Sequence, residues 1–145
     1  MPKALLATDA SDASMRAAKS LGELVGHHPE WEVTVLHVVP LPEALTAAAA
    51  GAPLTLPGRI DEYIQTRLQD VLRSTVEALN MPMEQVKTIH VIAIPGEAIL
   101  HEAKQGHYDL IVMGRRGISH LREVLLGSVS QAVLHGAHCP VLLVS

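Results

Sequence analysis

The feature that most constrains this fold is a regular alternation between short apolar runs and longer segments with apolar residues at helical spacing. Five runs are typical of buried strands, at residues 4–8, 33–39, 86–94, 109–113 and 140–144. Helical spacing marks the segments 11–25, 60–79, 96–103 and 128–135 between them. The alternation predicts an α/β fold, a doubly wound, five-stranded parallel sheet with helices on both faces and the strand order 3-2-1-4-5.

Length and composition fit one folded unit with an aliphatic core. The chain has 145 residues, and we expect a single domain over residues 1–145. Hydrophobic residues make up 48% of the sequence but aromatic residues only 2%. The core must therefore consist of aliphatic side chains, which suit buried parallel strands.

Charge, hydropathy and cysteine content argue against several partners and compartments. The formal net charge of -4 gives no basic surface for nucleic acid. No run reaches the roughly 18–20 apolar residues that a membrane-spanning helix needs, so we expect no membrane insertion. The first three residues lead directly into a strand, and Cys139 is the only cysteine. These features predict a cytoplasmic protein without a signal peptide or an internal disulfide.

The ligand site is expected at the carboxyl ends of the strands, because doubly wound sheets bind ligands where the strand order reverses. The residues at these ends are Asp9, Val38-Val39, Pro95-Gly96 and Met113-Gly114. The segment from Leu41 to Gly58 follows the second strand and is rich in alanine and proline. A loop of this length is typical of a lid, so we expect it to be mobile without ligand and to fold over the site.

The segment from Gly114 to Ser130 combines glycines at a strand end with glycine and serine at a helix start. Backbone N–H groups in such loops and at helix N-termini bind phosphate, and the hydroxyls of Ser128 and Ser130 add donors. A purely structural interpretation is also open, in which Gly114 makes a turn and Ser128 forms a capping box with Gln131. Likewise, Arg115, Arg116 and Arg122 either reach phosphate or form a solvated cationic loop.

The spacing Gly-x2-Gly-x9-Gly-Ser, at Gly114, Gly117, Gly127 and Ser128, resembles the signature of ATP-binding universal stress proteins. The resemblance extends over essentially the whole chain. It includes Ala7-Thr8-Asp9 with Ser11, the run Leu36-His37-Val38-Val39 and the closing run from His138 to Val144. Because the glycine motif is complete, the chain resembles the ATP-binding branch of that family, with its Rossmann-like fold of the adenine nucleotide alpha hydrolase kind.

The resemblance implies a nucleotide site at matching positions. Asp9 would lie near the ribose or a phosphate-bound Mg²⁺, with helix-end stabilisation as the alternative role for its carboxylate. The backbone of Val38 would meet the adenine, and Met113 with Gly114 would line the base and ribose. The full set of expected binding residues is Ala7, Thr8, Asp9, Val38, Met113, Gly114, Arg116, Gly117, Gly127, Ser128, Val129 and Ser130.

These observations predict an ATP-binding protein of the stress response whose nucleotide state controls an unknown regulatory partner. Two alternatives stay open: a slow nucleotide hydrolase or transferase that uses the same site, and an interaction module with an empty pocket. No P-loop, catalytic triad or paired carboxylates stand out, so we expect no catalytic residues and at most weak ATP hydrolysis. The nine histidines match no metal motif, and His135, His138 and Cys139 straddle a helix end and a strand start. The uncharged strand Val141 to Val144 predicts a homodimer through this edge, as the resemblance also implies.

Overall fold

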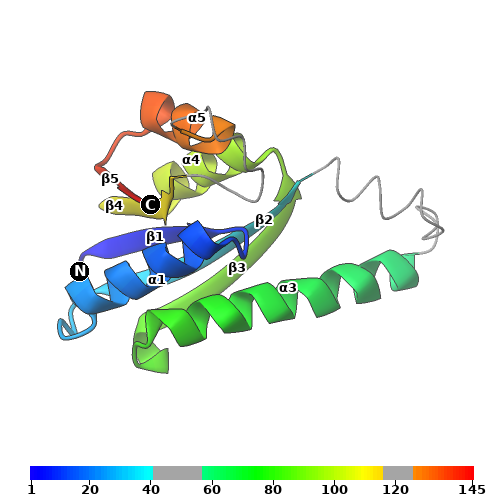
Figure 1. The fold of residues 1–145 in the computed structure, drawn as a ribbon, viewed down its shortest axis with the longest axis horizontal. Helices are drawn as coiled ribbons and strands as arrows, with labels where there is room; N and C mark the ends of the chain where they lie inside the picture. Colours follow the sequence, from blue (N-terminus) through cyan, green and yellow to red (C-terminus); the bar gives the residue numbers. More distant parts are fainter. Residues whose placement is uncertain (41–56, 116–125) are drawn as a thin grey trace.

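The computed structural model describes residues 1–40, 57–115 and 126–145, with side chains described outside residues 57–65. Strands and helices alternate along the chain as expected (Figure 1). The strands are β1 (Lys3–Thr8), β2 (Glu32–Pro40), β3 (Val86–Ala93), β4 (Leu110–Gly114) and β5 (Val141–Val144). The helices are α1 (Asp12–Val25), α3 (Pro57–Leu79), α4 (Pro95–Gln105) and α5 (Ser128–Gly136), with a 3-10 turn at Met83–Gln85.

The five strands form one parallel sheet in the order β3-β2-β1-β4-β5, which confirms the predicted topology. Helices α1 and α3 cover one face of the sheet, and α4 and α5 cover the other (Figure 1). The strand order reverses at β1, because β2 and β3 follow on one side of it and β4 and β5 on the other. The crevice of a doubly wound fold is therefore expected at the carboxyl end of β1.

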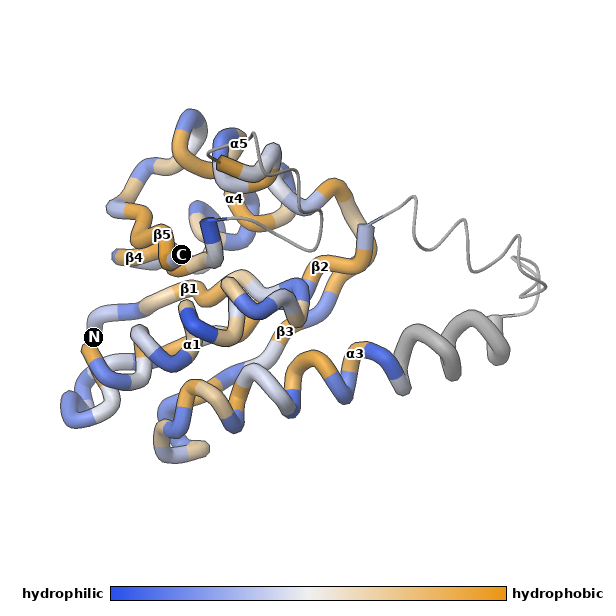
Figure 2. The backbone as a smooth tube through the Cα atoms, in the orientation of Figure 1, coloured by the Kyte–Doolittle hydropathy of each residue, from blue (hydrophilic) through white to orange (hydrophobic). Residues whose placement is uncertain are grey.

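Two apolar layers enclose the sheet, and the period of two along each strand divides its side chains between them. On β1, Ala4 and Leu6 pack under α1 and α3, whereas Leu5 and Ala7 pack under α4 and α5. Figure 2 shows mostly apolar colour along β4 and β5 and mixed colour along β3 and the helices. The core is aliphatic, as the composition predicts.

Several element ends differ from the sequence prediction for identifiable reasons. Pro95 and Pro57 are each the first residue of a helix, α4 and α3, because proline lacks the N–H that the first turn leaves unpaired. The last two residues of the predicted loop from Leu41 to Gly58 therefore belong to α3, and the other residues of that prediction lie outside the described residues. Leu24 belongs to the apolar spacing of α1, yet it is 59% exposed.

Membrane insertion finds no support in the described helices. Within residues 1–40, 57–115 and 126–145, no helix is long and apolar enough to cross a bilayer.

Candidate functional site

A cavity of about 610 Å³ opens at the carboxyl ends of β1, β2 and β4, beside the first turns of three helices. Ten of the twelve binding residues expected from the sequence line it, namely Ala7, Thr8, Asp9, Val38, Met113, Gly114, Gly127, Ser128, Val129 and Ser130. The other two, Arg116 and Gly117, lie outside the described residues. The structure thus brings the expected residues to one place, and their binding roles remain predictions.

The cavity exists because the central strand ends before its neighbours. The β1–β2 ladder ends at the pair Thr8 and His37, whereas β2 continues against β3 up to Pro40. On the other side, the β1–β4 ladder ends at Leu6 and Val112, whereas β4 continues to Gly114 against β5. The backbone of β2 beyond His37 and of β4 beyond Val112 therefore borders a notch above β1.

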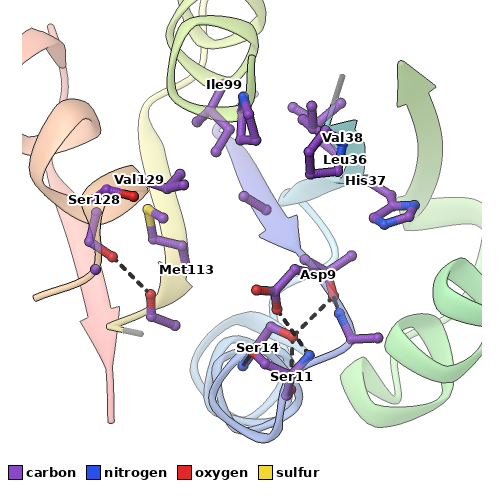
Figure 3. A pocket seen from close by; sticks show the side chains of 18 of the residues that line it. Asp9, Ser11, Ser14, Leu36, His37, Val38, Ile99, Met113, Ser128 and Val129 are labelled. Atoms are coloured by element: carbon purple, nitrogen blue, oxygen red, sulfur yellow. Dashed lines mark hydrogen bonds between the residues drawn. The ribbon is translucent and has the colours of Figure 1, made fainter. Parts of the chain in front are cut away.

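One wall of the notch is apolar. Leu36, Val38, Ile99 and Met113 belong to the core layer under α4 and α5, and Val129 packs against that layer. Figure 3 shows Leu36, Val38 and Ile99 together beneath α4, with Met113 and Val129 across the cavity from them. A flat apolar group of a ligand fits such a wall.

The N-terminus of α5 forms the opposite, polar wall. Gly127 is its N-cap residue, with φ -66° and ψ 159°, and no side chain of the described residues caps the first turn. The first backbone bond inside the helix runs from the N–H of Gln131 to the carbonyl of Gly127. The N–H groups of Ser128, Val129 and Ser130 precede it, so the first turn presents unpaired donors and a partial positive charge at the cavity.

The capping-box interpretation of Ser128 is wrong in this structure. A capping box needs Ser128 at the N-cap, but Ser128 is already the first helical residue. Gly127 also has a negative φ, so its role does not depend on the left-handed region that favours glycine.

Ser130 is not a free hydroxyl donor for phosphate. It is 2% exposed, and its Oγ donates to the carbonyl oxygens of Gly114 at 3.1 Å and Arg115 at 2.9 Å. The N–H of Gly127 donates to the same Arg115 carbonyl at 3.0 Å. These bonds anchor the start of α5 to the end of β4, so Ser130 positions the helix N-terminus at the cavity.

Gly114 also has a structural reason for being glycine. A Cβ at this position would lie 2.8 Å from the Cβ of Ala13 and 2.9 Å from the backbone nitrogen of Ser14. The first turn of α1 therefore approaches β4 too closely for any other residue. Access for a ligand and packing of α1 impose the same requirement here.

Asp9 is the first residue after β1, and its carboxylate lies at the base of the cavity (Figure 3). Its Oδ1 accepts a hydrogen bond from the backbone N–H of Ser11 at 2.9 Å. Ser11 is in turn the N-cap of α1, and its hydroxyl accepts from the N–H of Ser14 at 3.2 Å. Asp9 therefore orders the turn before the helix while its carboxylate lines the cavity.

Several further lining residues were not singled out from the sequence, and three of them bear on the chemistry of the cavity. Ile99 comes from α4, Arg67 from α3, and His37 from β2. His37 was placed in a strand but not at the site, although its position beside Thr8 follows from the strand register. The period of two puts both side chains on the α1 and α3 face, which is the signal that could have found it.

His37 is a buried neutral imidazole. Its pKa is lowered from 6.5 to about 4, first by burial and then by the positive charge of Arg67, while Asp9 opposes the shift and His90 adds to it. Its Nδ1 is buried and has no hydrogen-bond partner in the described part of the chain. The polar side of the cavity thus combines a carboxylate, a guanidinium and an uncharged imidazole.

The histidine-rich C-terminal region shows no metal-binding cluster within the described residues. Among the described residues, no three His, Cys, Asp or Glu side chains lie close enough to hold a metal ion. His135 and His138 are exposed, whereas Cys139 is partly buried against the core layer. Burial raises the pKa of the Cys139 thiol, which fits its predicted role as a small apolar residue.

Comparison with known proteins identifies a family. The model described as "Universal stress protein family" matches residues 1–145. Universal stress protein YxiE of Bacillus subtilis is 34% identical over 145 residues, which cover 98% of this chain and 97% of that protein. The solved structure of MJ0577 from Methanocaldococcus jannaschii has a TM-score of 0.76 at 29% identity, over 99% of this chain and 94% of that chain.

A solved universal stress protein in complex with cAMP shares the same fold. It has a TM-score of 0.67 at 21% sequence identity and covers 99% of this chain and 97% of that chain.

Proposed function

Because this chain belongs to the universal stress protein family, we propose that it binds an adenine nucleotide in the cavity and acts as a nucleotide-dependent regulatory protein of the stress response. ATP with Mg²⁺ is the proposed ligand. The whole chain, residues 1–145, acts as one domain in the cytoplasm. Nucleotide occupancy controls contact with a regulatory protein partner, and the chain binds neither nucleic acid nor membrane.

The observation that carries this proposal is the uncapped N-terminus of α5 at the cavity wall. The first turn presents the N–H groups of Ser128, Val129 and Ser130, and no side chain of the described residues occupies them. Backbone donors and the helix dipole together favour a phosphate group. The bonds from Ser130 and Gly127 to the end of β4 hold these donors in place before a ligand arrives.

The apolar wall, which faces the N-terminus of α5, suits the base of a nucleotide rather than a second charged group. Leu36, Val38 and Ile99 give an apolar surface for a planar ring. Val38 also lies beyond the last β1–β2 ladder pair, so backbone groups on the β1 side of β2 have no partner from β1 at this point. A purine offers donors and acceptors on its edge that suit such groups. The fold of the cAMP-bound relative is consistent with this assignment.

Asp9 fits a role toward Mg²⁺. Mg²⁺ in nucleotide sites is held by one or two carboxylates together with substrate phosphates and water. Asp9 contributes one carboxylate to the lining of a cavity whose α5 wall suits phosphate. Mg²⁺ would neutralise phosphate charge there, and Asp9 would fix its position.

A homodimer through β5 completes the proposal. β5 is at one edge of the sheet, and its four residues carry no charge, whereas the opposite edge strand β3 carries Lys87. An uncharged edge is a liability unless it is covered, and antiparallel pairing with a second copy would cover it.

The direct test is to purify the protein natively, denature it and identify any released nucleotide by mass. Calorimetric titration with ATP, ADP and AMP, with and without Mg²⁺, then measures preference and metal dependence. Gly127→Val should weaken ATP binding about tenfold or more, because a branched side chain would obstruct the phosphate position. The backbone of Gly127 permits valine, so the fold should persist.

His135→Val is the matched control. It places the same branched residue on the last turn of α5, where His135 is exposed and does not line the cavity. It should leave ATP affinity within about twofold, since surface changes rarely propagate. A wild-type protein without copurified or titratable nucleotide would favour an interaction module instead. Equal ATP affinity in Gly127→Val and wild type would refute the phosphate position.

A further inference from the structure

The turn that carries Asp9 is held by side chains rather than by a ladder or a helix. The N–H of Ala10 donates to Thr8 Oγ1 at 3.3 Å, and the N–H of Ser11 donates to Asp9 Oδ1 at 2.9 Å. Ala10 has a φ of 66°, in the left-handed region that is unfavourable for alanine. Such a conformation persists only where its surroundings enforce it. The placement of Asp9 therefore depends on the hydroxyl of Thr8.

Thr8 belongs to a buried chain of three hydroxyl groups that joins β1, α1 and α3. Thr8 Oγ1 lies 3.2 Å from Ser14 Oγ on α1 and 2.9 Å from Thr75 Oγ1 on α3. Thr75 is fully buried, and Thr8 and Ser14 are nearly so. The period of two explains the meeting, because Thr8 points to the same face as Ala4 and Leu6, where both helices lie.

The three hydroxyl groups cannot all donate to one another, because two of their protons are used in bonds to backbone carbonyls. Ser14 Oγ donates to the carbonyl of Ser11 at 2.9 Å, and Thr75 Oγ1 donates to the carbonyl of Val71 at 2.8 Å. Thr8 then has one proton for two neighbouring oxygens, those of Ser14 and Thr75. Its oxygen also accepts from the N–H of Ala10. Thr75 thus helps to decide where the Thr8 hydroxyl lies and whether it can hold Ala10.

Thr75 is rigid enough to act in this way. One turn further along α3, the carbonyl of Leu79 lies directly against Gly22 of α1, and a Cβ at Gly22 would collide with it. The two helices are therefore in close backbone contact beside the hydroxyl chain. A shift of α3 relative to α1 would change the contact between Thr75 and Thr8.

We propose that Thr75 is a positioning residue for the nucleotide site, which fixes the turn from Thr8 to Ser11, and hence Asp9, through the hydroxyl of Thr8. Thr75 does not line the cavity and touches no ligand. The effect on binding rests on the proposed nucleotide function, whereas the effect on the turn does not. Helix α3 is therefore part of what supports the site, although Thr75 and the residues after it on α3 do not line the cavity.

The first experiment needs no nucleotide. Amide hydrogen exchange at Ala10 and Ser11 is measured by NMR in wild type, Thr75→Val and Thr75→Ser. Thr75→Val keeps the side-chain shape but removes the hydroxyl, and it should speed exchange at Ala10 about fivefold or more. Thr75→Ser restores the hydroxyl and should stay within about twofold of wild type. Unchanged exchange in Thr75→Val, or equal acceleration in Thr75→Ser, would overturn the proposal.

Ser74→Ala is the matched control. Ser74 precedes Thr75 on α3, and its hydroxyl also donates to a carbonyl four residues earlier, that of Asp70 at 2.8 Å, but on the exposed face. Its removal should leave exchange at Ala10 within about twofold. An equal acceleration in Ser74→Ala would show a general effect on α3 and would overturn the specific role of Thr75.

The second experiment is a double-mutant cycle on ATP affinity with Thr75→Val and Asp9→Ala. Thr75→Val alone should weaken binding about three- to tenfold, the loss expected for one buried hydrogen bond. In the Asp9→Ala background the same change should have less than about twofold effect, because Thr75 acts through Asp9. An equal loss of ATP affinity on Thr75→Val in both backgrounds would contradict the claim that Thr75 acts through Asp9. Absence of ATP binding in wild type would instead refute the proposed function, and the exchange experiment would still decide the role of Thr75.

Discussion

Replacing His37 with glutamine should make the stability of the protein less dependent on pH. His37 is 6% exposed, belongs to the last β1–β2 ladder pair and lines the cavity. Burial and the charge of Arg67 lower its pKa from 6.5 to about 4, against a smaller opposing effect of Asp9. The folded state therefore excludes a proton that the unfolded chain takes up. The stability linked to His37 is complete above about pH 6.5 and is lost as the pH falls toward about 4.

The size of the effect follows from the two pKa values. A difference between 6.5 and about 4 corresponds to a loss of about 3 kcal/mol once the pH is below both values. This figure is an upper limit, because the cavity admits water to one side of the ring. Between about pH 7.5 and pH 5.5 the expected loss is about 1 kcal/mol. In this range few carboxylates titrate, so the histidines dominate the change.

The assay is urea unfolding at about pH 7.5 and pH 5.5 for wild type, His37→Gln and His90→Gln. His90 is the register partner of His37 on β3 but is exposed, so it controls for the loss of any histidine from this part of the sheet. The free energy of unfolding of wild type and His90→Gln should fall about 1 kcal/mol more than that of His37→Gln. An equal fall in all three proteins would refute the argument that His37 is held neutral by burial.

Two other predictions concern the site and the sheet edge. Asp9→Ala should weaken Mg²⁺-ATP binding more than it lowers the melting temperature, as measured by calorimetry; lower stability with unchanged affinity would support a purely structural role for the carboxylate. Leu143→Pro should convert a dimer to a monomer in light scattering. The even-numbered residues Pro140 and Val144 direct their carbonyls to β4. Backbone groups alternate in direction along a strand, so the N–H of the odd-numbered residue Leu143 is directed to the open edge. Leu142→Pro should instead disrupt the β4 ladder and the fold. A monomeric wild type at micromolar concentration, or a folded Leu143→Pro that still dimerises, would exclude this dimer.

The fold could be predicted from the sequence because each element carries a local signal that agrees with the whole. The apolar runs are separated by helical spacing, and this alternation leaves few topologies once crossovers are right-handed. The same signal predicted a site around Asp9, Val38 and Gly114, and all three residues line the cavity, while their binding roles remain predictions. The element ends were less certain, and the helix starts at Pro57 and Pro95 show why. The helical segments were expected to begin at residues 60 and 96, after these prolines, although proline also suits the first helical position.

Side-chain roles within the site were harder to predict, because spacing does not reveal which partner a polar group finds. The hydroxyl of Ser130 was expected to donate to phosphate, but it donates instead to backbone carbonyls at the end of β4. Gly114 was expected to admit a ligand, but the first turn of α1 already requires its small size. In both cases a contact between elements distant in sequence, absent from any local pattern, determines the role.

The contribution of α3 is the clearest case of this limit, and it also explains how the site is organised. Arg67 and Thr75 lie on one helix two turns apart, and one lines the cavity while the other supports the turn before α1. Helical periodicity predicts that both face the sheet, but not which strand end they meet, because that depends on how far α3 lies along the sheet. The close contact between Gly22 and Leu79 fixes this position. The contact between Gly22 and Leu79 thereby places the guanidinium of Arg67 near His37. It also places the hydroxyl of Thr75 beside that of Thr8.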